Sequence, residues 1–115
     1  MYPMAGNIYY ADLPYLENVQ SGKRPVIVTQ NNAGNKHASF VHVIPLTTRV
    51  NKARHMPTHI ILSPSDSNGL TKESVAIIEN MRPVSKDRLG KHVGRLCSEE
   101  LSRIGDAMRI QFPFM

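Results

Sequence analysis

The sequence predicts a mainly β protein with a helix at its C-terminal end. Short runs of β-branched and aromatic residues occupy the first two-thirds of the chain, and helical periodicity occupies the rest. Five or six such runs, separated by turn formers, are typical of a small barrel or sandwich. With 115 residues, 41% of them hydrophobic, the chain has the size of one domain, and we expect a single unit over 1–115.

The expected strands are the apolar runs that stop at turn-forming residues. The first, 8–13, ends at Pro14, and a loop leads on to Gly22. The continuous apolar run 25–29 predicts a second strand, and the Asn- and Gly-rich stretch 31–35 predicts the turn after it. The other strands are expected at 40–44, ending near Pro45, and, after a basic connection at 47–57, at 58–62 and 74–79.

The last third of the chain has helical periodicity, which predicts helices at 86–96 and 98–110. Ser98 is the expected N-cap of the second helix, because its hydroxyl can accept a free backbone N–H of the first turn. Apolar residues spaced three and four apart should pack this helix on the sheet, and they are Leu101, Ile104 and Met108.

The charge distribution points to an anionic partner. The net charge is +5, and no acidic residue occurs between Glu17 and Asp66. The cationic residues of that stretch are Lys23, Arg24, Lys36, Arg49, Lys52 and Arg54. A solvated basic face is the simpler explanation of a charge run, but one long acid-free stretch favours a polyanion site.

Other features of the sequence indicate the cellular location of the protein and whether it needs a metal or a cofactor. The apolar runs are much shorter than the roughly 20 residues of a membrane span, and the N-terminal residues do not resemble a secretion signal, so we expect a cytoplasmic protein. The single cysteine, Cys97, agrees with a reducing compartment and is expected to be a buried or spectator thiol. His55 and His59 are separated by Pro57, which prevents a shared helical face, so no metal and no cofactor are expected.

Four residues are candidates for chemistry. Arg24 lies where a loop meets an apolar strand, and its planar guanidinium can bind two phosphate oxygens at once. Thr47 and Thr48 follow the third expected strand and could donate hydroxyl hydrogen bonds to a phosphate or a base. Glu79 could orient an arginine or accept a proton, or it could form a surface ion pair with Arg82.

Six segments occur in a characteristic order: GNIYYADL at 6–13, GKRPVIVTQN at 22–31, IPLT at 44–47, PTH at 57–59, SVAIIENMR at 74–82 and DRL at 87–89. This ordered set resembles the MazF/PemK family of endoribonuclease toxins from type II toxin–antitoxin systems. The resemblance runs from about Gly6 to the final helix and so covers nearly the whole chain.

The resemblance implies a small SH3-like β-barrel of the MazF/PemK/CcdB type with a C-terminal helix, which forms a homodimer. It implies metal-independent cleavage of single-stranded RNA or mRNA at short recognition sequences, and an acidic MazE-like antitoxin as partner. The catalytic arginine and threonine of the family fall on Arg24 and Thr47, and its acidic position falls on Glu79. The residues expected to contact RNA are Lys23, Gln30, Asn31, Thr48, Arg49, Lys52, Glu79 and Asn80.

Such cleavage is chemically feasible without a metal, because a ribose 2′-OH can attack its own phosphate. The protein must then stabilise the negative charge that grows on the phosphorane, which Arg24 can do. The products are a 2′,3′-cyclic phosphate and a 5′-OH end. An arginine pKa above about 12 leaves the general base open, with Glu79 or a substrate phosphate as candidates.

Two other functions remain possible on the sequence alone. One is a gyrase-poisoning toxin on a similar barrel, but its helix ends in Trp-Gly-Ile, whereas this chain ends in QFPFM at 111–115. The other is a non-catalytic basic barrel that binds nucleic acid. The context of Arg24 and Thr47 favours the enzyme.

Overall fold

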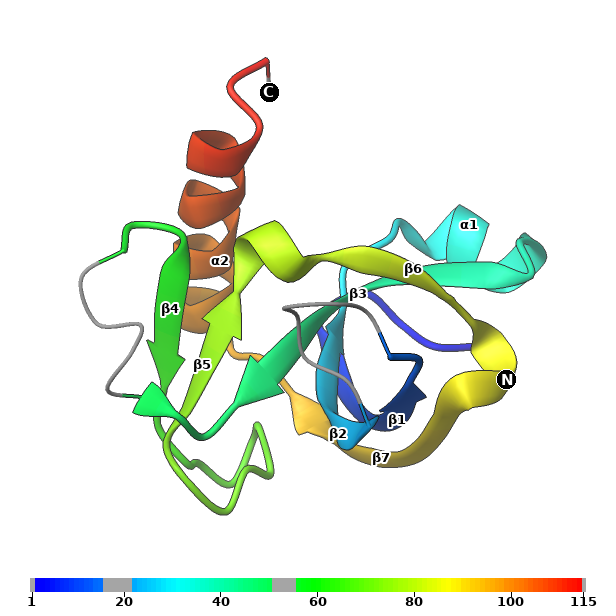
Figure 1. Ribbon diagram of the computed structural model, residues 1–115, viewed down its shortest axis with the longest axis horizontal. Coiled ribbons are helices and arrows are strands. Elements are labelled where there is room, and N and C mark those ends of the chain that lie inside the picture. The colour runs from blue at the N-terminus through cyan, green and yellow to red at the C-terminus, as the bar shows by residue number, and fades with distance from the viewer. Residues whose placement is uncertain (1, 16–21, 51–55, 115) are drawn as a thin grey trace.

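The computed structural model describes residues 2–15, 22–50 and 56–114, and it combines an antiparallel sheet with a C-terminal helix (Figure 1). The strands are β1 (Asn7–Leu13), β2 (Gly22–Val28), β3 (Phe40–Thr47), β4 (His59–Leu62), β5 (Ser74–Ile77), β6 (Arg82–Ser85) and β7 (Leu89–Arg95). The helices are α1 (Asn32–His37), the 3₁₀ turns η2 (Ile78–Asn80) and η3 (Lys86–Arg88), and α2 (Ser98–Gln111). Within the described ranges, no helix is long and apolar enough to cross a membrane.

Strand β3 is the centre of the seven-stranded sheet. The strand order is β4-β5-β3-β2-β1-β7, and β6 pairs separately with the first half of β3. The second half of β3 pairs with β5, so one strand joins both parts of the sheet. The predicted class, mainly β with a C-terminal helix, is confirmed. The predicted small barrel takes the form of a curved sheet that does not close in the described part of the chain, where β4, β6 and β7 each pair with a single strand (Figure 1).

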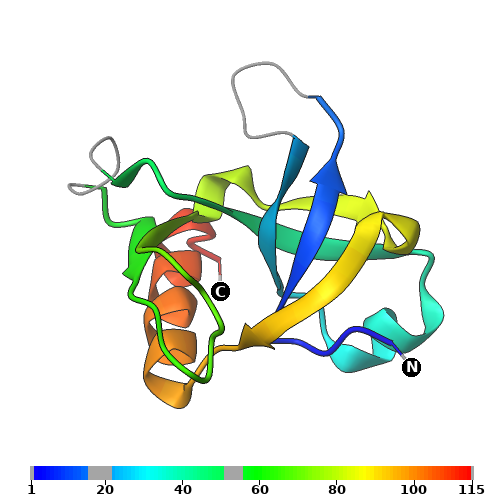
Figure 2. The ribbon, with the colours of Figure 1, turned by 90° about the horizontal axis from the view of Figure 1, so that it is seen from below.

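The central strands are buried on both faces, which explains why 25–29 is a continuous apolar run. Val26 and Val28 pack on one face in a cluster that includes Val84 of β6. Ile27 points to the opposite face and joins a second cluster with Ile104 of α2. Figure 2 shows α2 on one side of the molecule next to β4, with β1, β2 and β7 on the other side.

The predicted helix at 86–96 is wrong. These residues form η3 and then β7, which pairs with β1 through Ala11↔Leu89 and Asn7↔Arg95. Gly90 and Gly94 explain the difference, because glycine is a poor helix former. Gly94 also lies against the main chain of Asn68, where a Cβ would come within 2.3 Å of the Asn68 oxygen.

Pro45 and Pro83 lie inside strands at positions where the sequence predicted a strand end or no strand. Strand β3 continues through Pro45, which falls between Val43, the last residue paired with β6, and Leu46, the first paired with β5. A residue without an N–H is tolerated where the ladder changes partner. Pro83 lies in β6, which was not predicted and which pairs only with β3 among the described strands.

Both helix starts differ from the prediction. The expected turn at 31–35 contains the start of α1, which Asn31 caps by accepting the N–H of Gly34 at 2.9 Å. In α2 the N-cap is Cys97, not Ser98, and Glu100 accepts the Cys97 N–H at 2.9 Å in a capping box. Cys97 is exposed, which excludes the buried thiol.

The apolar face of α2 is confirmed only in part. Ile104 is buried and Met108 packs against the core, but Leu101 is 45% exposed. The buried positions are Glu100, Ile104 and Ala107.

Candidate functional site

Arg24 lies near the start of β2, opposite Ala11 of β1, and is half-buried. Its Nη1 donates a hydrogen bond to the carbonyl oxygen of Leu46 at 3.4 Å, which ties the guanidinium to the end of β3. Burial lowers the pKa of Arg24, and the positive charge of Arg49 lowers it further. The side chain is therefore held beside another cation in a partly desolvated position, where an anion would relieve the repulsion.

A third arginine belongs to the same group. Arg82 is the first residue of β6 and pairs with Val43 of β3. Burial lowers the pKa of Arg82, and the charge of Arg24 lowers it further. We call Arg24, Arg49 and Arg82 the arginine cluster. The sequence indicated Arg82 only as an ion-pair partner, although it precedes a proline at the start of a strand, as Arg24 does near the start of β2.

Thr47 is the last residue of β3 beside this cluster, and Thr48 follows it. The Thr47 hydroxyl oxygen accepts the backbone N–H of Arg49 at 3.2 Å, which fixes the turn that carries Arg49. Because Thr47 accepts in this bond, its own O–H can still donate to a ligand. The Thr48 carbonyl accepts the N–H of Val50 at 3.0 Å, and the Thr48 side chain is exposed.

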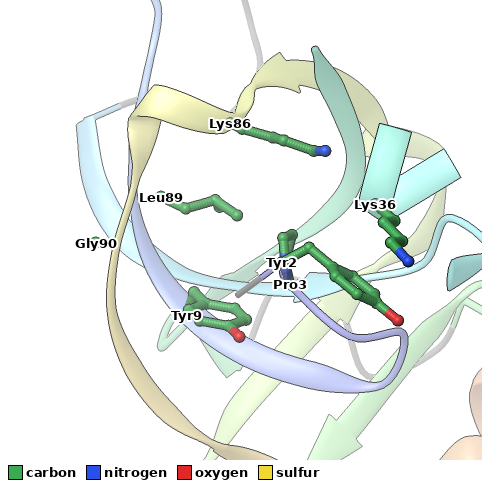
Figure 3. Close-up of a pocket in the computed structure, with 7 residues that line it drawn as sticks. All are labelled: Tyr2, Pro3, Tyr9, Lys36, Lys86, Leu89 and Gly90. Carbon is green, nitrogen blue, oxygen red and sulfur yellow. The ribbon is translucent and has the colours of Figure 1, made fainter. Parts of the chain in front are cut away.

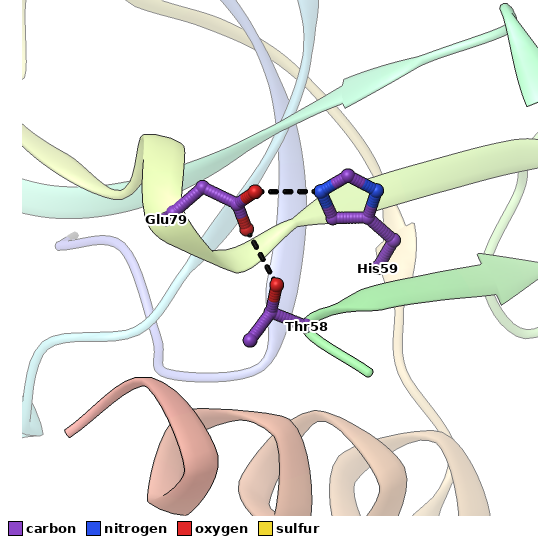
Figure 4. Close-up of polar contacts among 3 residues, drawn as sticks. All are labelled: Thr58, His59 and Glu79. Atoms are coloured by element: carbon purple, nitrogen blue, oxygen red, sulfur yellow. Dashed lines mark hydrogen bonds and ion pairs between the residues drawn. The ribbon is translucent and has the colours of Figure 1, made fainter. Parts of the chain in front are cut away.

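Glu79 forms a polar group with two neighbours, shown in Figure 4. Thr58 donates its hydroxyl to Oε1 of Glu79 at 2.7 Å, and Nε2 of His59 lies 2.7 Å from Oε2. Burial alone would raise the pKa of Glu79, but the hydrogen bonds from His59 and Thr58 outweigh it, and the pKa is lowered. The sequence analysis missed Thr58 and His59 as site residues, although both lie in the PTH segment.

Gln30 and Asn31 lie at the other end of β2 from Arg24. Both follow the end of β2, whereas Arg24 lies near its start. Nε2 of Gln30 donates to the carbonyl oxygen of Phe40 at 3.2 Å, and Asn31 caps α1. Their local bonds support the connection between β2 and β3.

The other predicted RNA contacts lie on elements that surround the cluster. Lys23 is exposed on β2 beside Arg24. Asn80 is half-buried at the end of η2, between Glu79 and β6. Lys52 lies outside the described residues.

The comparisons with known proteins identify the family. The model of the PemK-like, MazF-like toxins of type II toxin–antitoxin systems matches residues 4–112. The chain belongs to this family. Endoribonuclease MazF of Staphylococcus saprophyticus is 37% identical over 106 residues, which cover 91% of this chain and 87% of the relative.

Solved structures of MazF-like toxins have the same fold. A mycobacterial endoribonuclease, solved in complex with its cognate antitoxin, superposes with a TM-score of 0.80 at 28% identity and covers 98% of this chain and 97% of that one. MazF of Deinococcus radiodurans gives a TM-score of 0.81 with 98% of both chains covered. At 20% identity, this second match supports the fold alone.

Proposed function

We propose that this chain, taken as one toxin domain over 1–115, is a sequence-selective endoribonuclease that cuts single-stranded RNA, including mRNA, without a metal. Membership of the toxin family and 37% identity to a named endoribonuclease confirm the predicted class of activity. Metal-independent cleavage at this site is supported by the arginine cluster next to Thr47. The cluster concentrates fixed positive charge beside a hydroxyl donor.

In the proposed reaction, the 2′-OH of one nucleotide gives its proton to an oxygen of a substrate phosphate and attacks the adjacent phosphorus, and the bond to the 5′-oxygen breaks as that oxygen takes up a proton. The products are a 2′,3′-cyclic phosphate and a 5′-OH end. Arg24 binds the phosphate oxygens with its planar fork and stabilises the charge that develops on them. Thr47 donates its O–H to the same oxygens, and Arg49 and Arg82 bind the same or a neighbouring phosphate.

Glu79 is assigned to RNA recognition and not to proton transfer. A general base works best with a pKa near the working pH, and the lowered pKa of Glu79 makes it a weak base. An ionised carboxylate held by Thr58 and His59 is instead a fixed acceptor for an exocyclic amine of a base. Lys23, Thr48 and Asn80 are the remaining proposed contacts around the cluster.

The proposed partners are a second copy of this chain and an acidic MazE-like antitoxin in the cytoplasm. Large apolar side chains remain exposed on α2 and after it, which supports burial in a homodimer. These residues are Leu101, Ile110, Phe112 and Phe114. The mycobacterial relative was solved with its cognate antitoxin, and an acidic segment suits a surface that carries the arginine cluster.

Primer extension on one long RNA tests the proposal. The RNA is incubated with the purified chain in excess EDTA, and an Arg24→Ala sample serves as the matched control. We expect discrete cuts that share a short sequence, carry 5′-OH ends and disappear in the control. Intact RNA, or cutting only when a divalent metal is added back, would refute the proposed reaction.

A further inference from the structure

A basic cavity that shares no residue with the arginine cluster lies beside the N-terminal residues. Its volume is about 490 Å³, within the ordinary range for small-molecule sites. It is open to solvent and is lined by the N-terminal residues, β1, the end of α1 and the segment from η3 into β7 (Figure 3). The lining side chains used below are Tyr2, Tyr9, Lys36, Lys86 and Leu89.

Two lysines reach into this cavity from opposite walls. Figure 3 shows Lys86 extending from η3 toward α1, and Lys36 extending from α1 toward the Tyr2 ring. No carboxylate is present among the described residues that line the cavity. Two ammonium groups without a local acid make a site for an anion such as a phosphate.

The lysines are carried by fixed backbone. The N–H of Lys86 donates to the carbonyl oxygen of Ser39 at 3.1 Å, and the Ser85 hydroxyl oxygen accepts the N–H of Asp87 in the same turn. On the other wall, α1 is fixed by Asn35, which is fully buried and donates to the carbonyl oxygen of Gln30 at 2.8 Å. The two walls of the cavity are therefore formed before a ligand binds.

Two tyrosines form the floor of the cavity. The Tyr2 ring lies below Lys36, and the Tyr9 ring lies below Leu89 (Figure 3). Tyr9 packs against the core valines, and its ring meets His92 edge-on with centroids 5.1 Å apart. Aromatic faces beside lysines are what single-stranded nucleic acid binds, because bases stack on rings while phosphates contact the cations.

We propose that this cavity binds one unpaired nucleotide of the RNA substrate, outside the segment that is cut. The base stacks on Tyr2 or Tyr9, and the phosphate lies between Lys36 and Lys86. The inference rests on the proposed RNA cleavage, and it assigns the chain a second RNA contact that increases affinity for long single strands without taking part in the reaction.

The test compares two non-cleavable RNAs, made with a 2′-deoxy nucleotide at the mapped cut. One is a short oligonucleotide limited to the recognition sequence, and the other carries unstructured flanks on both sides. Binding is measured for wild type, for Lys36→Gln/Lys86→Gln and for Tyr2→Leu. The matched control is Lys72→Gln/Lys91→Gln, which removes the same charge from exposed lysines that do not line the cavity.

We expect the cavity variants to bind the long RNA about tenfold more weakly and the short RNA normally. The lysine variant should also lower the salt dependence of long-RNA binding by roughly one phosphate contact. Cleavage of the short RNA, made without the deoxy nucleotide, should keep its wild-type rate in every variant. The two hypotheses fail separately, because the cut is mapped first on a long RNA: absence of any cut refutes the proposed activity, whereas a mapped cut with unchanged long-RNA binding refutes only the second contact.

Three results would refute the proposed second RNA contact. They are an unchanged affinity of the cavity variants for the long RNA, an equal loss for both RNAs, and an equal loss in the control. A free nucleoside monophosphate is titrated in parallel. If it binds wild type but not the cavity variants while long-RNA binding stays unchanged, the ligand is a free nucleotide and the RNA assignment is wrong.

Discussion

The imidazole of His59 lies behind the carboxylate of Glu79, with Nε2 2.7 Å from Oε2. The His59 side chain is only 11% exposed, whereas that of Glu79 is 34% exposed. Nδ1 of His59 is buried and has no hydrogen-bond partner among the described residues, so the ring faces solvent mainly through the carboxylate it holds. The pair thus presents one oriented negative group at the surface.

This arrangement predicts how stability depends on pH. The pKa of Glu79 in the fold is below its ordinary value of 4.5, so its stabilising contribution is complete above 4.5 and is lost as the pH falls through the folded pKa. Thermal unfolding of wild type and Glu79→Gln should therefore differ most at neutral pH and converge well below 4.5. A constant difference across this range would contradict the lowered pKa.

Loss of Arg24 should stop catalysis without unfolding the protein. Arg24→Ala is expected to lower the cleavage rate by roughly a hundredfold or more, because it removes a donor to the developing charge. Arg24→Lys should restore little, since an ammonium lacks the bidentate fork. Single-turnover rates, with circular dichroism as the folding control, test both, and a wild-type rate for Arg24→Ala would end the catalytic assignment.

Thr47 should have a smaller effect that depends on its hydroxyl. Thr47→Ala removes the donor and the acceptor that holds the N–H of Arg49, and we expect a loss of about tenfold. Thr47→Ser keeps both functions and should retain most activity. Equal rates for the alanine and serine variants would make Thr47 a structural residue.

The tight contact at Gly94 predicts a large loss of stability. Gly94→Ala would place a Cβ 2.3 Å from the backbone oxygen of Asn68, so we expect a loss of at least about 2 kcal/mol in the free energy of unfolding. Gly105→Ala in α2 is the matched control, because its nearest neighbour, Nη1 of Arg109, would be 3.7 Å away. Helix propensity then predicts a gain of roughly 0.5–1 kcal/mol. Urea denaturation of the two variants gives the comparison.

RNA and the antitoxin should compete for the arginine cluster. Binding of RNA should weaken steeply with salt, while the antitoxin should be affected less if apolar anchors contribute to its binding. Titrating antitoxin into complexes with non-cleavable RNA at two ionic strengths tests this. Retention of RNA at saturating antitoxin would place the antitoxin elsewhere on the molecule.

The local pattern of apolar residues predicted the strands well where the strands are buried in the core. The run at 25–29 had to be a strand because Val26, Ile27 and Val28 are buried on alternating faces. The pattern failed at 86–96, where two glycines disfavour a helix and pairing with β1, which is distant in the sequence, determines the structure. It failed also at Pro45, because the change of partner along β3 is a property of the assembled sheet.

The residues of the site were likewise predictable only where a local feature of the sequence marks them. Arg24 could be found because a cation at a strand start, next to a proline, is a local feature. Arg82 joins the arginine cluster because β6 pairs with β3. His59 contacts Glu79 because β4 pairs with β5. Both relationships join residues that are distant in the sequence, so spacing alone did not identify them.

The central position of β3 has a consequence for the newly made chain. β3 pairs with β2, which precedes it, and with β5 and β6, which are translated later. Such non-local pairing slows folding, since loops must close before the strands can pair. Arg24 is also translated well before Arg82. The arginine cluster can therefore assemble only after most of the chain has been translated. A nascent toxin emerging next to mRNA would thus remain harmless through most of its own synthesis.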